Sequence, residues 1–255
     1  MTALTTPRVP PGHYRFPQAA RMEWIKLRSL RSTWWTLAIT AAAATGIGVA
    51  VGLNTRNASS DLTNNALAGI APGLLLAGVL GVLAMTSEYT FGMIRATLAT
   101  IPDRRLLLTA KATVFAALTL AIGELTAFIA FFAGGASLRH GISAPTLAQP
   151  GVLQAVVLSG AGFGLIGLMG LGLGAIVRHT PAAIAVLVGG VYVVAQFIGG
   201  ITRALMAYVP ISIVANSMAT TKNPMLSPWA GLGLLCLYAG VLLAIGGWLL
   251  TRRDA

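Results

Sequence analysis

The sequence predicts an all-α membrane protein whose single domain contains six transmembrane helices. Hydrophobic residues account for 56% of the 255 residues, and the mean hydropathy is +0.81. Only 9% of the residues are charged, whereas a typical soluble domain has about 25%. The apolar residues also gather in runs of about 20 residues or more, the length a helix needs to cross the hydrocarbon core of a bilayer. These observations exclude a soluble globular protein.

The N-terminal region predicts a cytoplasmic tail followed by an interfacial helix. Residues 1–18 contain four prolines and no apolar period, so we expect them to be disordered, with one domain over residues 19–255. That domain should begin with a basic amphipathic helix in the membrane interface, in which Glu23 can pair with Lys26. Its apolar stripe comprises Ala20, Trp24, Leu27, Leu30 and Trp34. Arg31 also falls on this stripe, so a basic flank that only orients the first span stays open as the alternative.

Six apolar runs between residues 34 and 250 predict the membrane spans. A transmembrane helix needs about 20 residues, and each run is close to that length or longer. The longest connections are residues 87–111, in the middle of the chain, and residues 202–228, before the last span. The predicted spans are residues 34–53, 67–86, 112–133, 151–177, 181–201 and 229–250.

The distribution of positive charge predicts the orientation of these spans. With six spans, thirteen of the 17 Lys and Arg residues lie on the side of the two termini, and the other four lie opposite. Those four are Arg56, Arg139, Arg203 and Lys222. Because Lys and Arg concentrate in cytoplasmic loops, we expect both termini and residues 87–111 in the cytoplasm. The same bias explains the net charge of +11 without a nucleic-acid partner.

Residues 87–111 are the most informative connection between two spans. Pro102 disfavours helical geometry in the residue before it and so ends a short helix. Asp103 is a candidate N-cap for the helix that follows. An apolar face at helical spacing comprises Phe91, Ile94, Leu98 and Ile101. The stretch therefore predicts a short amphipathic helix at the membrane surface, which a passive connection would not need.

The glycines of the fourth span indicate helix packing rather than nucleotide binding. Gly162, Gly164 and Gly167 match the pattern G-x-G-x-x-G, but that pattern binds a dinucleotide only between a strand and a helix. Here it lies in the middle of a span. Small residues at 160/164 and 170/174 have the spacing that lets helix backbones approach closely.

No catalytic, metal or cofactor site is predicted for this chain. It lacks the G-x-x-x-x-G-K-[ST] loop that binds ATP, and neither G-x-S-x-G nor H-E-x-x-H occurs. The histidines, His13, His140 and His179, fall in three different segments, which argues against a zinc site. The single cysteine, Cys236, allows no intramolecular disulfide.

Two features are candidates for lining a substrate cavity. Glu124 is the one acidic residue well inside a span, and an intramembrane charge is a functional candidate by default. A protonated or paired glutamate with a structural role is the alternative. Tyr192 and Gln196, in the fifth span, are possible partners for it. Residues 202–228 mix apolar runs with three prolines, which suits short re-entrant helices that are packed in protein or line a water-filled cavity.

Two stretches resemble bacterial ABC-2 type permeases, the membrane subunits of ABC exporters. One resembles the cytoplasmic loop after the second span in that family, through Glu88, Tyr89, Gly92, Met93, Ile94, Arg95, Thr97, Leu98, Pro102, Arg104 and Lys111. The other resembles the opening of the family's chains, through Glu23, Trp24, Lys26, Leu27 and Arg28 and the residues up to Trp35. The six-span layout and the long connection before the last span also agree with the family.

The resemblance implies a role for each segment. Residues 92–101 would be the coupling helix, seated in a cleft of a separately encoded ATPase subunit, and residues 20–31 the interface helix beside it. Residues 202–228 would be the outer re-entrant helices. Two permease subunits, identical or different, and two ATPase subunits would form the transporter in the bacterial cell membrane. ATP and Mg²⁺ would bind to the ATPase, and this chain would bind no cofactor.

The expected function is export of an amphipathic or lipophilic substrate, such as a drug, an antibiotic, a peptide or a lipid-like molecule. Three alternatives remain. An immunity or sensor protein would bind a ligand without transporting it. A membrane-embedded lipid-modifying enzyme would need a cluster of acids, histidines or metal ligands near one interface, which the sequence does not offer. A passive channel would need spans with more polar or charged residues.

Overall fold

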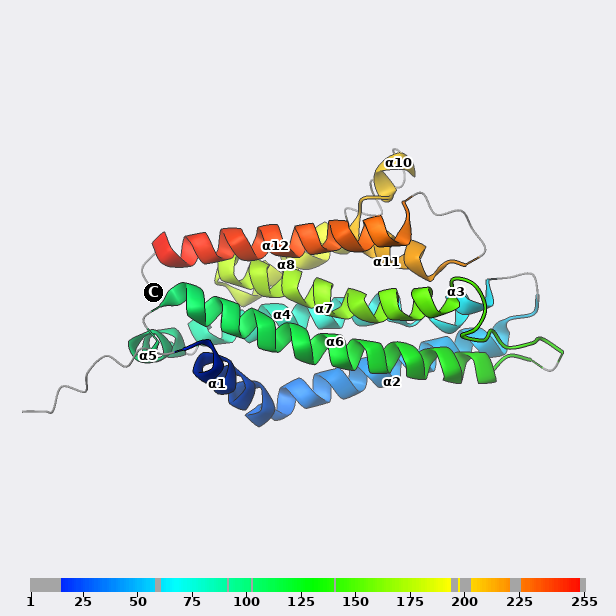
Figure 1. Ribbon diagram of the computed structural model, residues 1–255, viewed down its shortest axis with the longest axis horizontal. Helices are drawn as coiled ribbons and strands as arrows, with labels where there is room; N and C mark the ends of the chain where they lie inside the picture. The colour runs from blue at the N-terminus through cyan, green and yellow to red at the C-terminus, as the bar shows by residue number, and fades with distance from the viewer. Residues whose placement is uncertain are drawn as a thin grey trace, which may run out of the picture.

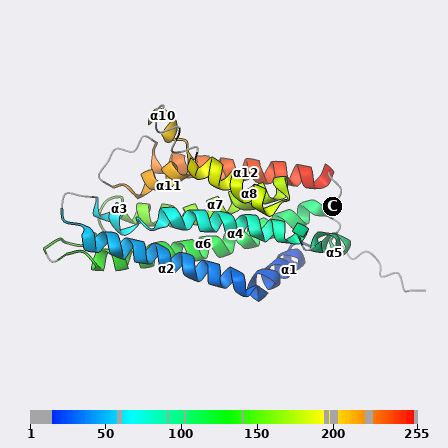
Figure 2. The ribbon, with the colours of Figure 1, turned by 180° about the vertical axis from the view of Figure 1, so that it is seen from behind.

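The computed structural model describes an elongated bundle of helices (Figure 1 and Figure 2). It describes residues 15–57, 61–90, 92–101, 103–139, 141–193, 197, 203–220 and 226–252. This part of the chain is all-helical, with 83% helix and no strands, so the predicted fold class is confirmed at that level.

Five helices in the described part of the chain are long and apolar enough to cross a membrane. They are α2 (Arg31–Asn54), α4 (Ile70–Thr90), α6 (Arg104–Ala136), α7 (Val152–Val177) and α12 (Pro228–Arg252). Each coincides with one of the predicted spans. The protein is therefore a multi-pass helical protein of membrane-embedded character.

The remaining predicted span, residues 181–201, is shown only in part. α8 (Thr180–Val188) starts where the span was expected, with a proline in its first turn, and passes into a short π-helix, η1 (Gly189–Val193). Beyond η1, residues 194–196 and 198–202 lie outside the described residues. The fifth predicted span, and with it the total of six, therefore stays a prediction.

The shorter helices mark the two ends of the bundle (Figure 1). One end carries α1 (Phe16–Ser29), α5 (Met93–Thr100) and the last turn of α12, and we call it the α5 end. The other carries α3 (Leu62–Ala66) and α11 (Pro210–Met218), preceded by the short α10 (Arg203–Met206), and we call it the α3 end. Both termini of the described chain thus lie at the same end.

Two helices begin earlier than the apolar pattern predicts. α6 begins at Arg104, about two turns before the predicted span. The cause is Asp103, whose Oδ1 accepts hydrogen bonds from two backbone N–H groups of the first turn at 2.9 and 3.1 Å, as expected of an N-cap. α1 begins at Phe16, so residues 16–18 belong to a helix and not to the predicted tail, of which residues 1–14 lie outside the described part.

α7 is the central helix and packs against α4, α6 and α12. Its glycines make this close packing feasible. A Cβ atom added at Gly170 would overlap the backbone carbonyl of Gly78 on α4, and one added at Gly164 would overlap the Leu120 side chain on α6. The predicted packing role of these glycines is confirmed.

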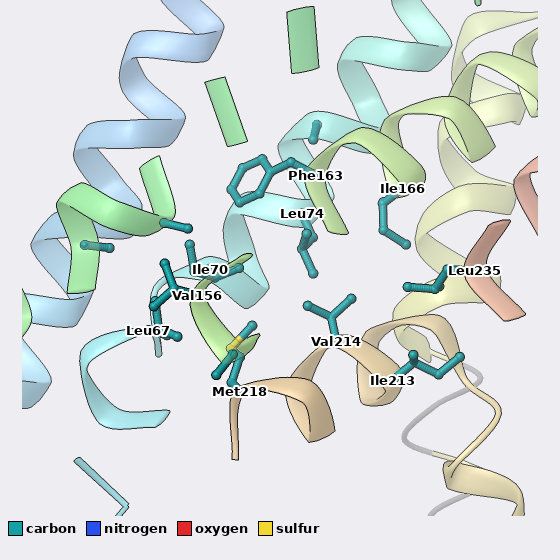
Figure 3. Close-up of a cluster of buried hydrophobic side chains, with 14 of the residues drawn as sticks. Leu67, Ile70, Leu74, Val156, Phe163, Ile166, Ile213, Val214, Met218 and Leu235 are labelled. Atoms are coloured by element: carbon teal, nitrogen blue, oxygen red, sulfur yellow. The ribbon is translucent and has the colours of Figure 1, made fainter. Parts of the chain in front are cut away.

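The main hydrophobic core lies toward the α3 end, where α11 closes against the long helices (Figure 3). Its labelled members come from α4 and the turn before it, α7, α11 and α12: Leu67, Ile70, Leu74, Val156, Phe163, Ile166, Ile213, Val214, Met218 and Leu235. Just after α11, the backbone N–H and hydroxyl of Thr220 donate to the Asp61 carboxylate at 2.6 and 3.0 Å. A short helix packed in protein is therefore observed within the predicted connection 202–228, of which residues 221–225 are not described.

Candidate functional site

α5 is the short helix that the sequence predicts between two membrane-spanning helices. Gly92 precedes it with φ 66°, in the left-handed region that glycine adopts without strain. Ile101 follows it in an extended conformation, with φ −120° and ψ 92°. Because the chain turns sharply on both sides, α5 is a separate helix at the end of the bundle and continues neither α4 nor α6 (Figure 1).

One face of α5 packs on the rest of the protein. Ile94 and Ile101 are buried and Leu98 is half-buried, in a cluster with Ala19 of α1 and Leu107 of α6. Three of the four residues of the predicted apolar face therefore point inward, and the fourth, at position 91, lies outside the described residues. The amphipathic character read from the sequence is confirmed for these three positions.

The opposite side of α5 is exposed. Gly92 and Ala99 are open to the surroundings, and the Met93 side chain is 48% exposed, although methionine is apolar. The side chain of Arg95 and the whole of Pro102 lie outside the described residues. This outer side is the part of the predicted coupling segment that another molecule can reach.

Four charged side chains from three helices form a closed cluster beside α5, which we call the charged ring. Lys111 Nζ on α6 lies 2.5 Å from Glu23 Oε2 on α1 and 2.8 Å from Glu88 Oε1 on α4. Lys26 Nζ on α1 lies 3.0 Å from Glu23 Oε1 and 2.9 Å from Glu88 Oε1. Each lysine contacts both carboxylates, so the ring joins α1, α4 and α6. The predicted pair of Glu23 and Lys26 is confirmed as one side of it.

Three of the four members of the charged ring are buried, and the fourth, Lys26, has a side chain that is 30% exposed. The exposed fractions are 1% for Glu23, 2% for Glu88 and 5% for Lys111. Removing a charge from water costs several kcal/mol unless an opposite charge and hydrogen bonds compensate it. Two ammonium groups and two carboxylates cancel here. Moving α1 away from α4 and α6 would separate them, so the ring holds the three helices in one arrangement.

The charged ring also reaches α5. Lys26 Nζ donates to the Thr97 hydroxyl at 3.4 Å, and Thr97 is buried on the inner side of α5. Glu88 and Thr97 both belong to the segment predicted to couple to an ATPase, and both are buried. A role for either in coupling would therefore act through the ring and not through direct contact.

Two arginines cap the C-terminus of α12. Arg104 Nη1 donates to the backbone oxygen of Leu250 at 2.6 Å, and Arg178 Nη2 to that of Leu249 at 3.4 Å. Cations are favourable here because the last carbonyls of a helix lack partners within the helix. Arg178 Cζ also lies 5.2 Å from the centroid of the Tyr89 ring, a cation–π contact. Arg104 and Tyr89, expected at a partner interface, thus make contacts within the chain.

The buried face of α1, the predicted interface helix, is shifted from its apolar stripe and shares Leu27 with it. Ala19, Glu23 and Leu27 are buried against the bundle, while Trp24 and Arg28 are exposed. The buried face is rotated because Glu23, a charged residue, is drawn into the ring. The exposed tryptophan leaves a large apolar surface on the outside of α1, where lipid could contact it.

Of the three residues predicted for a substrate cavity, Glu124 is the one whose side chain the structure describes. It lies on α6 against Gly160 of α7, and its Oε2 is buried without a hydrogen-bond partner among the described residues. The side chain of Tyr192 and all of Gln196 lie outside the described part. Two surface cavities of about 480 and 310 Å³ are lined by other residues. The structure therefore places Glu124 at a helix interface.

The positions of the charged residues in the sequence already indicate the charged ring. Glu88 and Lys111 lie just beyond the predicted spans 67–86 and 112–133, and Glu23 lies in the predicted interface helix at the same boundary of the predicted membrane. The chain has six acidic residues in all, so two of them at one level already invite a search for basic partners. The contacts of Arg178 had no such signal, because they depend on where α12 ends.

Comparison with known proteins found no family model and no curated protein that matches the chain. Among the described residues, no three His, Cys, Asp or Glu side chains gather where they could hold a metal ion. An exposed short helix, linked to three other helices by a buried charged ring, can receive another molecule and pass a displacement inward.

Proposed function

We propose that this protein is the membrane-spanning subunit of an ABC-2 type exporter and works with a separately encoded ATPase subunit. The observation that carries the proposal is the arrangement of α5. This short helix lies between two long apolar helices, packs its apolar face on α1 and α6, and exposes its other side at the end of the bundle. A partner can hold such a helix from outside while its inner face stays attached to the bundle.

The proposed mechanism follows from the contacts of α5. ATP binding in the partner would displace α5, and the contact of Thr97 with Lys26 would pass the displacement to the charged ring. Because the ring is buried and balanced, α4 and α6 would move with α1 instead of separating from it. α1 would thus serve as the interface helix. Alternating exposure of a cavity between two permease subunits, identical or different, would follow.

The charge distribution supports a cytoplasmic position for the α5 end in a bacterial cell membrane, because Lys and Arg concentrate in cytoplasmic segments. Described basic residues in elements of this end are Arg15, Arg21, Lys26, Arg28, Arg31, Arg104, Arg105, Lys111, Arg178 and Arg252. At the α3 end the described part contains Arg56 and Arg139, with α10 adding Arg203. An ATPase is cytoplasmic, so the end with α5 is the end it could reach.

The proposed cargo is amphipathic or lipophilic. Polar side chains are few inside the long helices. Glu124 lies in the middle of α6, whereas Glu88 lies near the end of α4, in the charged ring. A cavity with so little polarity suits an apolar molecule better than a small ion. At the α3 end, α11 and the segment around it would act as the outer re-entrant helices.

The test is purification of the tagged protein in mild detergent, with mass spectrometry to quantify what comes with it. The expected result is an ATPase subunit carrying the G-x-x-x-x-G-K-[ST] loop. Met93→Glu, on the exposed side of α5, should remove it, because a buried negative charge would replace an apolar contact. Arg95→Glu and Gly92→Pro should also remove it.

The matched control is Asn54→Glu, which adds the same charge at the exposed C-terminal end of α2, at the α3 end. It should leave the ATPase bound, since the partner contacts only one side of the membrane. Export of the cargo should fail in Met93→Glu and persist in Asn54→Glu. Recovery of a homo-oligomer without any ATPase would overturn the proposal and favour a binding protein of the immunity or sensor type.

A further inference from the structure

The junction of α1 and α2 forms a fixed elbow, residues 28–38, on the outside of the bundle. Leu30 is extended there, with φ −82° and ψ 101°, so α1 and α2 are two helices and not one. The Trp34 indole N–H donates to the Arg28 carbonyl at 3.2 Å and bridges the break. The elbow therefore has a definite shape, and its tryptophan is held by a hydrogen bond.

The elbow contains a shallow cavity of about 310 Å³. Its lining residues are Arg31, Trp34, Trp35 and Ala38. The Trp35 side chain is 66% exposed, and Ile39 continues the exposed apolar surface along α2. The cavity thus has a positive group at its edge, two indoles at its walls and an apolar surface leading toward the middle of a membrane-length helix.

No acidic side chain in the described part of the chain neutralises the positive charge of the elbow. Arg28 and Arg31 are both exposed, and neither makes a salt bridge with any other described residue. The acidic residue of the same helix, Glu23, is buried and already balanced by Lys26 and Lys111. Two arginines therefore stand beside two tryptophans without a salt bridge to any acidic residue of the described ranges.

We propose that the elbow binds a phospholipid with an anionic headgroup. Arg31 and Arg28 would hold the phosphate, because a guanidinium forms paired hydrogen bonds with phosphate oxygens. The indoles would lie at the level of the headgroups, where tryptophan concentrates in membrane proteins. One acyl chain would follow the exposed side of α2 past Ala38 and Ile39. Lipid binding at this site does not rest on the proposed transport function, although Arg28 lies on α1, the proposed interface helix.

The experiment is native mass spectrometry of the full chain released from detergent micelles, titrated with phosphatidylglycerol or with phosphatidylcholine of the same acyl chains. The wild type should retain phosphatidylglycerol in preference. Arg31→Gln and Arg28→Gln should each reduce that preference about fivefold, the effect of one cationic side chain next to an anionic membrane lipid. The double variant should bind the two lipids almost equally.

The matched control is Arg105→Gln, which removes one exposed arginine from the same end of the bundle but away from the elbow. It should keep the wild-type preference. Trp35→Ala should weaken both lipids alike, because it removes apolar contact and no charge. Unchanged thermal midpoints and elution volumes would show that each variant is folded.

Two results would overturn the proposal. Equal retention of both lipids by the wild type would mean that the elbow is an apolar contact without headgroup recognition. A loss of preference in Arg105→Gln as large as in Arg31→Gln would mean that the lipid responds to the net charge of the α5 end and has no defined site.

Discussion

Lys111 Nζ lies 2.5 Å from Glu23 Oε2, although the two residues are 88 positions apart in the chain. The pair joins α6 to α1, and Glu88 brings in α4. A buried salt bridge adds little net stability, because the loss of hydration offsets most of the attraction. Breaking one leaves a buried charge without its partner. The contact therefore matters most for the position of α1 relative to the bundle.

Lys111→Met should lower the free energy of unfolding by about 3–5 kcal/mol, the usual effect of removing one member of a buried ion pair. Two buried carboxylates would then share Lys26. The measurement is the thermal midpoint in detergent, compared with Arg105→Met as a control for loss of an exposed cation on the same helix. The control should change little.

The double variant Lys111→Met with Glu23→Gln restores the balance of one lysine and one carboxylate in the ring. It should recover part of the stability lost in Lys111→Met, because no uncompensated charge remains. The same thermal midpoints give the coupling between the two residues. Losses that simply add would contradict the ring as a coupled unit.

Prediction from sequence succeeded where the signal is local. The apolar runs predicted α2, α4, α6, α7 and α12, and Asp103 was expected at the start of α6 from its position after a proline. Glu23 and Lys26 lie about one helical turn apart in the same helix, so their ion pair could also be predicted from the sequence.

Prediction failed where contacts depend on how whole helices are placed. Lys111 pairs with Glu23 because α1 packs across α4 and α6. Arg178 donates a hydrogen bond to α12 because α12 ends beside it. Neither contact can be predicted from the spacing of residues along the sequence. The rotated face of α1 has the same origin, since Glu23 faces inward and pairs with Lys111 of another helix.

Substitutions at Gly92 should rank by their tolerance of a positive φ. A Cβ added at Gly92 would have nothing within 4 Å, so only the backbone conformation matters. Gly92→Ala should cost about 1 kcal/mol and Gly92→Asn less, because asparagine adopts this conformation more readily. Gly92→Pro should be worst, since proline requires φ near −65° and lacks the N–H that Gly92 donates to the Tyr89 carbonyl at 3.2 Å. Limited proteolysis near α5 measures the order. Equal cleavage of the Ala and Pro variants would contradict it.

Arg104→Gln should loosen the end of α12. The guanidinium donates to the Leu250 carbonyl at 2.6 Å, and its loss should cost about 1 kcal/mol or more of local stability. Hydrogen exchange of the last turn of α12 should then be several-fold faster than in the wild type. Arg104→Lys keeps a cation near the helix end and should fall between the two. Unchanged exchange in Arg104→Gln would show that the contact does not hold this turn.

Substitution of glycine by alanine should lower the stability of the protein at glycines that pack against another helix and leave it unchanged at the others. Gly170→Ala should destabilise the protein by about 1–3 kcal/mol, because the new Cβ would overlap the backbone carbonyl of Gly78 and force α7 away from α4. Gly240→Ala, on the exposed side of α12 with nothing within 4 Å, should be neutral or slightly stabilising, since alanine favours the helix more than glycine. The measurement is the thermal midpoint of each variant in the same detergent, compared with that of the wild type. Both substitutions add the same atoms to a long helix. An equal loss of stability in the two variants would therefore mean that the approach of α7 to α4 does not require glycine at position 170. Helix propensity or lipid contact would then explain the loss.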